Sequence, residues 1–190
     1  MVQAIADQTP NHPRLQELFA YLGIRRAALR EAVNGVPVEV RNERPGADRW
    51  SVAEVLEHLA LVEGRFKTMI ADRLAGAKAG GLAAEGDTSS IVGSYNVAPL
   101  LDRREKHTAP DVVVPQSADW QTAWNRLDEV RRQFLDVYLS GDGLALGDVV
   151  HHHPRIGTLN LYQWGVWLGG HEARHTEQVH EIGVSLKSDV

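Results

Sequence analysis

The chain has 190 residues, a net charge of −5 with neutral histidines and 43% hydrophobic residues, enough for one domain with a sizeable core. It contains no cysteine, which excludes disulfides, thiolate ligands and a cysteine nucleophile. It also has no run of Lys and Arg, so we expect no nucleic-acid partner. The N-terminus lacks the apolar core of a signal peptide and no apolar run could span a bilayer, so we expect a cytoplasmic protein with no membrane partner.

The first part of the chain predicts a leader and one long helix. Residues 1–12 are polar, and we expect a single domain over residues 13–185. Pro13 is tolerated in the first turn of a helix, and leucines at helical spacing extend this helix to about Val33. Residues 36–40 are β-prone but include a proline, which favours an edge strand or a linker.

The second helix has a clear start. Ser51 and Glu54 have the spacing of a capping box, in which each side chain satisfies a free backbone N–H of the first turn. We expect the helix to reach about Ala77, with His58 at the border of its apolar face. That face is formed by Val52, Val55, Leu56, Leu59, Val62, Phe66, Met69 and Ile70.

Residues 78–116 show no regular pattern. A connection this long inside a compact domain is usually functional or contains short elements of its own. Two interpretations stay open, a lid that folds over a site and a partly disordered crossover.

The last part of the chain predicts two more long helices. The third begins at Ser117 or Asp119 and ends before Gly141. Residues 149–154 are expected to be extended, and the final helix then runs to near Gly183. Four amphipathic helices without a strong strand predict an all-α fold, an antiparallel four-helix bundle with a long crossover between the second and third helices. Sites in such bundles are built from side chains on facing helices.

Two histidines in the final helix are candidates for metal binding. His171 and His175 are four residues apart, so their imidazoles lie on one face and can converge on one ion. The alternative is a pair of core-edge histidines that are hydrogen-bonded to their neighbours. The pair shares a stripe with apolar residues and so faces inward, the stripe being Trp164, Trp167, His171, His175, Gln178 and Ile182.

Four short motifs occur together in this chain. They are Trp50-Ser51-x-x-Glu54-x-x-x-His58-Leu59, Ala109-Pro110 with Pro115, His153-Pro154-x-x-Gly157, and His171-x-x-Arg174-His175-x-x-Gln178. With these motifs the chain resembles the DinB-like superfamily and, within it, the YfiT-like metal-dependent hydrolases. The resemblance covers most of the chain, from about Leu15 to Ile182.

The resemblance implies a four-helix bundle with a divalent-metal site whose ligands are His58, His171 and His175. It also implies a homodimer, and the wider superfamily includes thiol S-transferases and a thiol-dependent isomerase that use low-molecular-weight thiols. Three neutral imidazoles leave an open coordination position, which is typical of catalytic rather than structural sites, and zinc or nickel suits such ligands.

We therefore expect a metal-dependent enzyme that activates water or a thiol, for hydrolysis or thiol S-transfer on a small-molecule substrate. The alternative is a non-catalytic helical bundle that binds metal or a ligand, with a structural metal. The sequence does not separate the two reactions.

Several residues near the histidines have candidate roles. Glu172 would be the general base if His-Glu-x-x-His were the zinc-protease motif, but too little chain follows for a third ligand, so a solvated carboxylate is favoured. Gln178 could hold a water or orient an imidazole. Arg174 could bind a substrate carboxylate or pair with Glu63. The run 151–153 is a weak candidate for a second metal site, and its last histidine is a candidate backbone-orienting residue.

Overall fold

The computed structural model describes residues 9–104, 108–116 and 119–187, and its main elements are four long helices. These are α1 (Pro13–Asn34), α2 (Val52–Ala79), α4 (Trp120–Leu139) and α5 (Leu161–Lys187). The predicted all-α bundle with a long crossover between its second and third long helices is confirmed. Most of the predicted leader, residues 1–8 of 1–12, lies outside the described residues.

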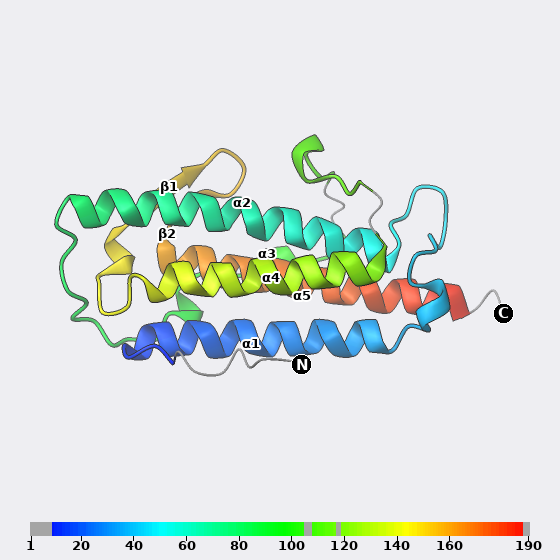
Figure 1. Ribbon diagram of the computed structural model, residues 1–190, viewed down its shortest axis with the longest axis horizontal. Coiled ribbons are helices and arrows are strands. Elements are labelled where there is room, and N and C mark those ends of the chain that lie inside the picture. The colour runs from blue at the N-terminus through cyan, green and yellow to red at the C-terminus, as the bar shows by residue number, and fades with distance from the viewer. Residues whose placement is uncertain (1–8, 105–107, 117–118, 188–190) are drawn as a thin grey trace.

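The helices run in two opposed pairs. In Figure 1, α1 and α5 point one way and α2 and α4 the other, so the crossover joins two parallel helices while each shorter connection joins antiparallel ones. The main packing is α1 on α5 and α2 on α4, with α2 also contacting α5. The contact between α2 and α5 therefore joins helices that are distant in sequence.

The helix starts follow the predicted caps. In the capping box of α2, the Glu54 backbone N–H donates to Ser51 Oγ (3.2 Å) and the Ser51 N–H donates to Glu54 Oε2 (2.9 Å). Asp119 caps α4 by accepting from two backbone N–H groups, and Ser117, the alternative start, lies outside the described residues. The final helix continues past its predicted end near Gly183 to Lys187, and Gly183 itself lies close to Val36, just after α1.

Two short segments needed the structure to define them. Residues 36–40 were expected to be an edge strand or a linker, and they form a linker that contains the 3-10 turn η1 (Val38–Val40), in which the carbonyl of Pro37 accepts from the Val40 N–H. The extended segment at 149–154 is confirmed as β1 (Val150–His153), but it pairs antiparallel with β2 (Gly157–Asn160), a strand that was not predicted from the sequence. Gly157 has φ of 99°, a conformation that favours glycine.

Four buried charged side chains separate two apolar clusters of the core. They are Arg26 from α1, Glu63 from α2, Arg131 from α4 and Glu172 from α5. On each helix the charged residue lies between members of the two clusters, of which Phe134 and Trp164 represent one and Leu56, Leu127 and Ile182 the other. Every long helix thus contributes one charge, and two positive charges meet two negative ones.

Small residues bring α1 and α5 close together. A Cβ atom on Gly165 would lie 2.7 Å from Leu18 Cδ1, and one on Gly169 would lie 2.2 Å from Tyr21 Cε1. Both distances are shorter than any real carbon contact, so the observed packing requires glycine at both positions. This close contact sets the position of the stretch of α5 that leads to His171.

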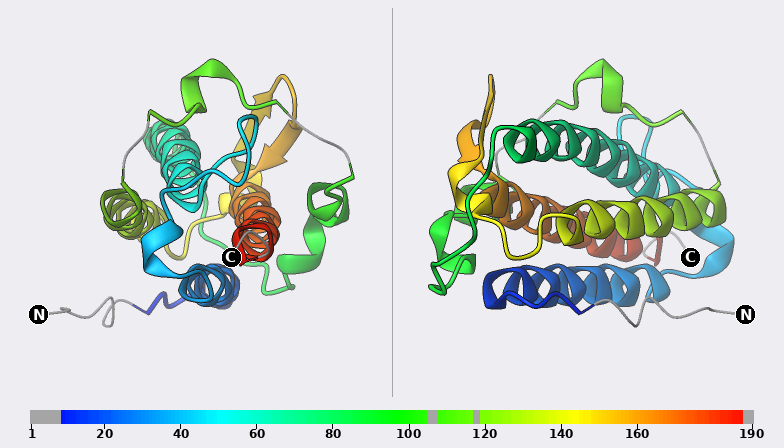
Figure 2. Two further views of the ribbon diagram at one scale, coloured as in Figure 1. Left: turned by 90° about the vertical axis from the view of Figure 1, so that its right-hand side faces the viewer. Right: turned by 60° about the vertical axis from the view of Figure 1, so that its left-hand side comes forward.

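The crossover has short elements of its own. It contains η2 (Val92–Ser94), α3 (Ala98–Leu101) and η3 (Asp111–Val113), and the turn η4 (Leu146–Asp148) follows α4. Figure 2 shows α3 beside α5 and η3 above α2, so the described parts of the crossover contact both of these helices. Among the helices in the described part of the chain, none has the length and apolar character needed to cross a membrane.

Candidate metal centre

Three histidines from two helices meet where α2 and α5 are in contact. His58 comes from the first half of α2, and His171 and His175 come from consecutive turns of α5. The ring centroids are 4.6 Å apart for His171 and His175, 4.9 Å for His58 and His175, and 5.4 Å for His58 and His171. One nitrogen of each ring lies within 4.8 Å of the other two, which makes this cluster a possible site for a metal ion.

Hydrogen bonds at Nδ1 orient two of the rings. His58 Nδ1 is 2.8 Å from the carbonyl oxygen of Val113, and His175 Nδ1 is 2.8 Å from Gln178 Oε1. Because a carbonyl oxygen only accepts, each ring must donate its Nδ1 hydrogen, and its Nε2 then carries a free lone pair. Metal-binding histidines commonly have this arrangement, with one nitrogen on the ion and the other held by an oxygen.

The third ring is held by stacking. His171 lies parallel to Trp167, with centroids 5.0 Å apart and an interplanar angle of 15°. Its Nε2 is 3.2 Å from Nε2 of His175, while its buried Nδ1 has no hydrogen-bond partner among the described residues. Two nitrogens on one tetrahedral zinc ion are separated by about 3.3 Å, so the spacing of this pair fits a shared ion.

Burial keeps the imidazoles neutral. His58 and His175 are only 4% and 7% exposed. Burial lowers the pKa of His58, and it lowers the pKa of His175 to about 3, with the nearby His58 adding to the effect. Burial, together with His175, His58 and Arg174, also places the pKa of His171 well below its ordinary value. Neutral imidazole is the form that binds metal, so the site needs no deprotonation near neutral pH.

Described parts of the crossover are hydrogen-bonded to α2 and α5 near the histidines. The carbonyl of Val113 in η3 accepts from His58, and Arg174 Nη1 donates to the carbonyls of Leu100 (2.8 Å) and Asp102 (2.7 Å). These contacts fix both described parts of the segment against the helices that carry the histidines.

Two expectations for the charged residues are wrong. Glu172 is not solvated but 2% exposed, and its carboxylate accepts from Arg26 Nε (2.6 Å) and Arg131 Nη2 (3.0 Å). Although burial raises its pKa, Arg131 and Arg26 outweigh that effect and hold the pKa of Glu172 below its usual range. Glu63 pairs with the same two arginines and not with Arg174, since all these charges lie at the bundle centre.

The run 151–153 lies in the hairpin, away from the three ligands. His151 Nδ1 accepts from Arg73 Nε at 3.1 Å. His153 Nδ1 accepts from the backbone N–H of Arg155 at 3.2 Å, which matches the expected backbone-orienting role. Within the described residues the only three-ligand cluster is the one formed by His58, His171 and His175, so no second metal site is supported.

Two contacts of the site were not predicted from the sequence. The carbonyl of Val113 is a backbone group, and no side-chain pattern indicates it. Trp50, 4.9 Å from His58 by ring centroids, precedes the capping box and could have been predicted to lie near this ligand from its position before the helix. Stacking of Trp167 on His171 is the outcome of their four-residue spacing on one helix face.

Comparisons with known proteins agree with this architecture. The family model of the DinB superfamily matches residues 21–179. The chain is 28% identical over 155 residues to the uncharacterized protein YuaE of Bacillus subtilis (strain 168), an alignment that covers 79% of this chain and 87% of YuaE. No solved structure shows significant similarity to the chain.

Proposed function

We propose a metal-dependent enzymatic function for this chain, which belongs to the DinB superfamily. Proteins of this family often bind metal, and His58, His171 and His175 form a cluster compatible with a divalent ion. The proposed reaction is attack by a water or a thiol on a small-molecule substrate, with hydrolysis or thiol S-transfer as the outcome.

The observation that supports this proposal best is the fixed orientation of the imidazoles. His58 Nδ1 donates a hydrogen bond to the carbonyl oxygen of Val113, and His175 Nδ1 donates one to Oε1 of Gln178. In each ring Nε2 is then free to bind a metal ion. His171 completes the set with an Nε2 at 3.2 Å from that of His175. Histidines that served only the core would not need to place one nitrogen of each of three rings within 4.8 Å of the other two.

Three protein ligands leave room for a further ligand. Within the described residues no fourth His, Cys, Asp or Glu joins the cluster, which is typical of catalytic sites. A bound zinc or nickel ion supplies a Lewis acid there, which lowers the pKa of a water or thiol and polarises a carbonyl group. Because the chain has no cysteine, a thiol has to come from a second substrate.

Other residues of the chain orient the imidazole rings and surround them with apolar side chains. Gln178 orients the His175 ring, and Trp167 covers one face of the His171 ring with apolar surface. Val113 connects the crossover to His58, so movement of this segment would change the orientation of that ligand. Glu172 is held by Arg26 and Arg131, and we assign it a structural role in place of general base.

Metal analysis of variants tests the ligand set. Protein purified without added metal should contain one equivalent of a divalent ion, and His58→Ala, His171→Ala and His175→Ala should each lose it while keeping the helical circular dichroism spectrum. His180→Ala is the matched control, because His180 is an exposed histidine of the same helix and should not affect metal content. A full equivalent of metal in His58→Ala would contradict the three-ligand site.

Activity assays separate the enzyme from the binding-module alternative. Turnover of electrophilic small molecules should be assayed with and without a low-molecular-weight thiol, then after chelation, then after return of zinc or nickel. Activity that disappears on chelation and returns with metal supports the proposal, and a need for thiol identifies S-transfer. Full activity after chelation would refute the metal mechanism. Metal that raises thermal stability without any turnover would favour a structural ion.

A further inference from the structure

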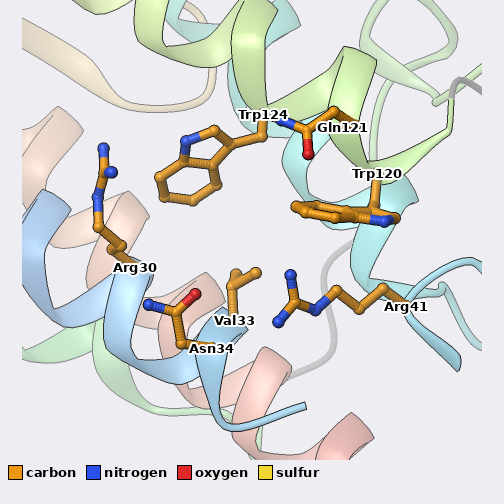
Figure 3. Close-up of a pocket in the computed structure, with 7 residues that line it drawn as sticks. All are labelled: Arg30, Val33, Asn34, Arg41, Trp120, Gln121 and Trp124. Carbon is orange, nitrogen blue, oxygen red and sulfur yellow. The ribbon is translucent and has the colours of Figure 1, made fainter. Parts of the chain in front are cut away.

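A pocket of about 180 Å³ lies at the end of the bundle where α1 ends and α4 begins. None of the residues that line it comes from α2 or α5, the helices that carry the three histidines. Figure 3 shows its seven lining residues, which are Arg30, Val33, Asn34, Arg41, Trp120, Gln121 and Trp124. This pocket is therefore separate from the metal centre and calls for its own explanation.

Arg41 is the unusual member of the lining. It is only 6% exposed, and its Nε donates to the carbonyl of Val36 at 3.0 Å. Its guanidinium carbon lies 4.4 Å from the centre of the Trp120 ring. Among the residues that the structure describes, no carboxylate lies within ion-pair distance of it. Burial lowers its pKa, and the more distant charge of Glu39 only partly opposes that effect. A buried charge without an adjacent counter-ion is unfavourable, so this position is expected to carry a function.

The terminal nitrogens of Arg41 point into the pocket. In Figure 3 its guanidinium group is directed into the space bordered by Val33 and Trp120. Since Nε already donates to Val36, the end of the guanidinium group offers two parallel N–H donors, a geometry that matches the two oxygens of a carboxylate. The pocket lining contains no Asp or Glu that could occupy these donors.

The rest of the lining is aromatic and only weakly charged. Trp120 and Trp124 are one turn apart on α4 and place two indole rings at the pocket. Arg30 lies 4.9 Å over the Trp124 ring, but it is largely exposed and pairs with Asp128 at 3.2 Å. The charge of Arg30 is therefore compensated by an adjacent carboxylate, whereas among the described residues Arg41 has none at ion-pair distance.

We propose that this pocket binds a small aromatic carboxylate, whose carboxylate group pairs with the terminal nitrogens of Arg41 while its ring packs against Trp120 and Trp124. The volume is below the roughly 300–1,000 Å³ of pockets for drug-sized ligands, which limits the ligand to about one ring. The planar, bidentate fit favours a carboxylate over a phosphate ester. The proposal does not depend on the metal-dependent activity.

Binding of benzoate to the full-length protein tests the proposal. Calorimetry should give a dissociation constant of roughly 1 mM or below. The indole N–H signals of Trp120 and Trp124 should shift in NMR spectra, and the same shifts should occur in His58→Ala, which excludes binding at the metal centre. Neutral benzamide should not bind. Absence of benzoate binding, equal binding of benzamide, or tighter binding of phenyl phosphate would overturn the assignment.

Two variants of the pocket and one control complete the test. Arg41→Met should weaken benzoate binding at least about tenfold by removing the charged donor. Asn34→Asp should do the same without truncating any side chain, because it adds a negative charge to the pocket lining that repels the carboxylate of the ligand, and it keeps the test valid if Arg41→Met does not fold. Arg30→Met, the matched control at an exposed arginine, should change affinity less than about fivefold. Unchanged binding in Asn34→Asp would refute the proposal.

Discussion

The variant Glu172→Gln should lower the free energy of unfolding rather than remove a catalytic group. The substitution keeps the size of the side chain and removes its charge. In the folded protein that charge contacts Arg26 Nε at 2.6 Å and Arg131 Nη2 at 3.0 Å, with all three residues at least nine-tenths buried. The two guanidinium groups would then share Glu63 as their only fully buried counter-charge.

The size of the loss follows from burial. Breaking a buried ion pair by neutralising one partner costs about 3–5 kcal/mol, because an uncompensated charge stays out of water. We expect about 3 kcal/mol, the lower end, since Asp128 also contacts Arg26 at 2.8 Å and is half-buried. Against a total of about 5–15 kcal/mol for a typical domain, this is a large fraction.

Urea unfolding of the chelated protein measures this effect without a contribution from metal. Glu181→Gln is the matched control on the same helix, because its ion pair with Arg103 is exposed and should contribute less than about 1 kcal/mol. The double variant Glu172→Gln/Arg131→Met should lose less than the sum of the single changes. If Glu172→Gln costs no more than Glu181→Gln, the argument from the buried network is wrong. A stable Glu172→Gln protein with about 10²-fold less turnover would instead identify a general base.

Four further predictions concern packing, the metal ligands and assembly. Gly169→Ala should cost about 1–3 kcal/mol in thermal unfolding, because its Cβ would lie 2.2 Å from Tyr21, whereas Gly76→Ala, with open space around it, should be neutral or stabilising. Gln178→Leu should weaken metal binding about 10–100-fold in chelator competition, because the His175 ring loses its acceptor, and unchanged affinity would contradict that role. In the metal-free protein the pKa of His175 is about 3 when folded and 6.5 ordinarily, so unfolded chains bind more protons between these values. The contribution of the neutral His175 to the free energy of unfolding is fully present above about pH 6.5 and should decrease as the pH is lowered toward 3. A urea midpoint that stays constant over this range would contradict this prediction. We also expect a homodimer, from the family resemblance and the exposed apolar side chains of α1 and α5, and light scattering that gives a monomer mass at micromolar concentration would contradict it.

The long helices could be predicted because their signals are local. The Ser51–Glu54 capping box and the periodic apolar residues placed the start of α2 within one residue, and the first helix likewise ended within one residue of its predicted limit. The spacing of His171 and His175 placed two imidazoles on one face for the same reason. Addition of His58 to the pair depended on the family resemblance, because a single histidine on a helix border has no distinctive pattern.

The features that were missed depend on tertiary contacts. The strand Gly157–Asn160 has no alternating pattern that distinguishes it from a turn, and it exists because it pairs with Val150–His153. Arg26, Arg131 and Glu172 resemble ordinary solvated charges in the sequence, and only the packing of four helices shows that they compensate one another. Charge alone cannot indicate which side of a helix will be buried.

The ion network and the metal ligands constrain the same two helices. On α5, Glu172 follows His171 and lies about 100° around the helix axis, so its pairing with Arg26 and Arg131 turns the histidine toward α2. On α2, Glu63 lies five residues after His58 and joins the same network. Another rotation of either helix would leave a buried carboxylate without its guanidinium partners, which is strongly unfavourable. The network therefore restricts α2 and α5 to the rotation in which the three imidazoles face one another, and this explains why so many charges lie in the centre of a small bundle.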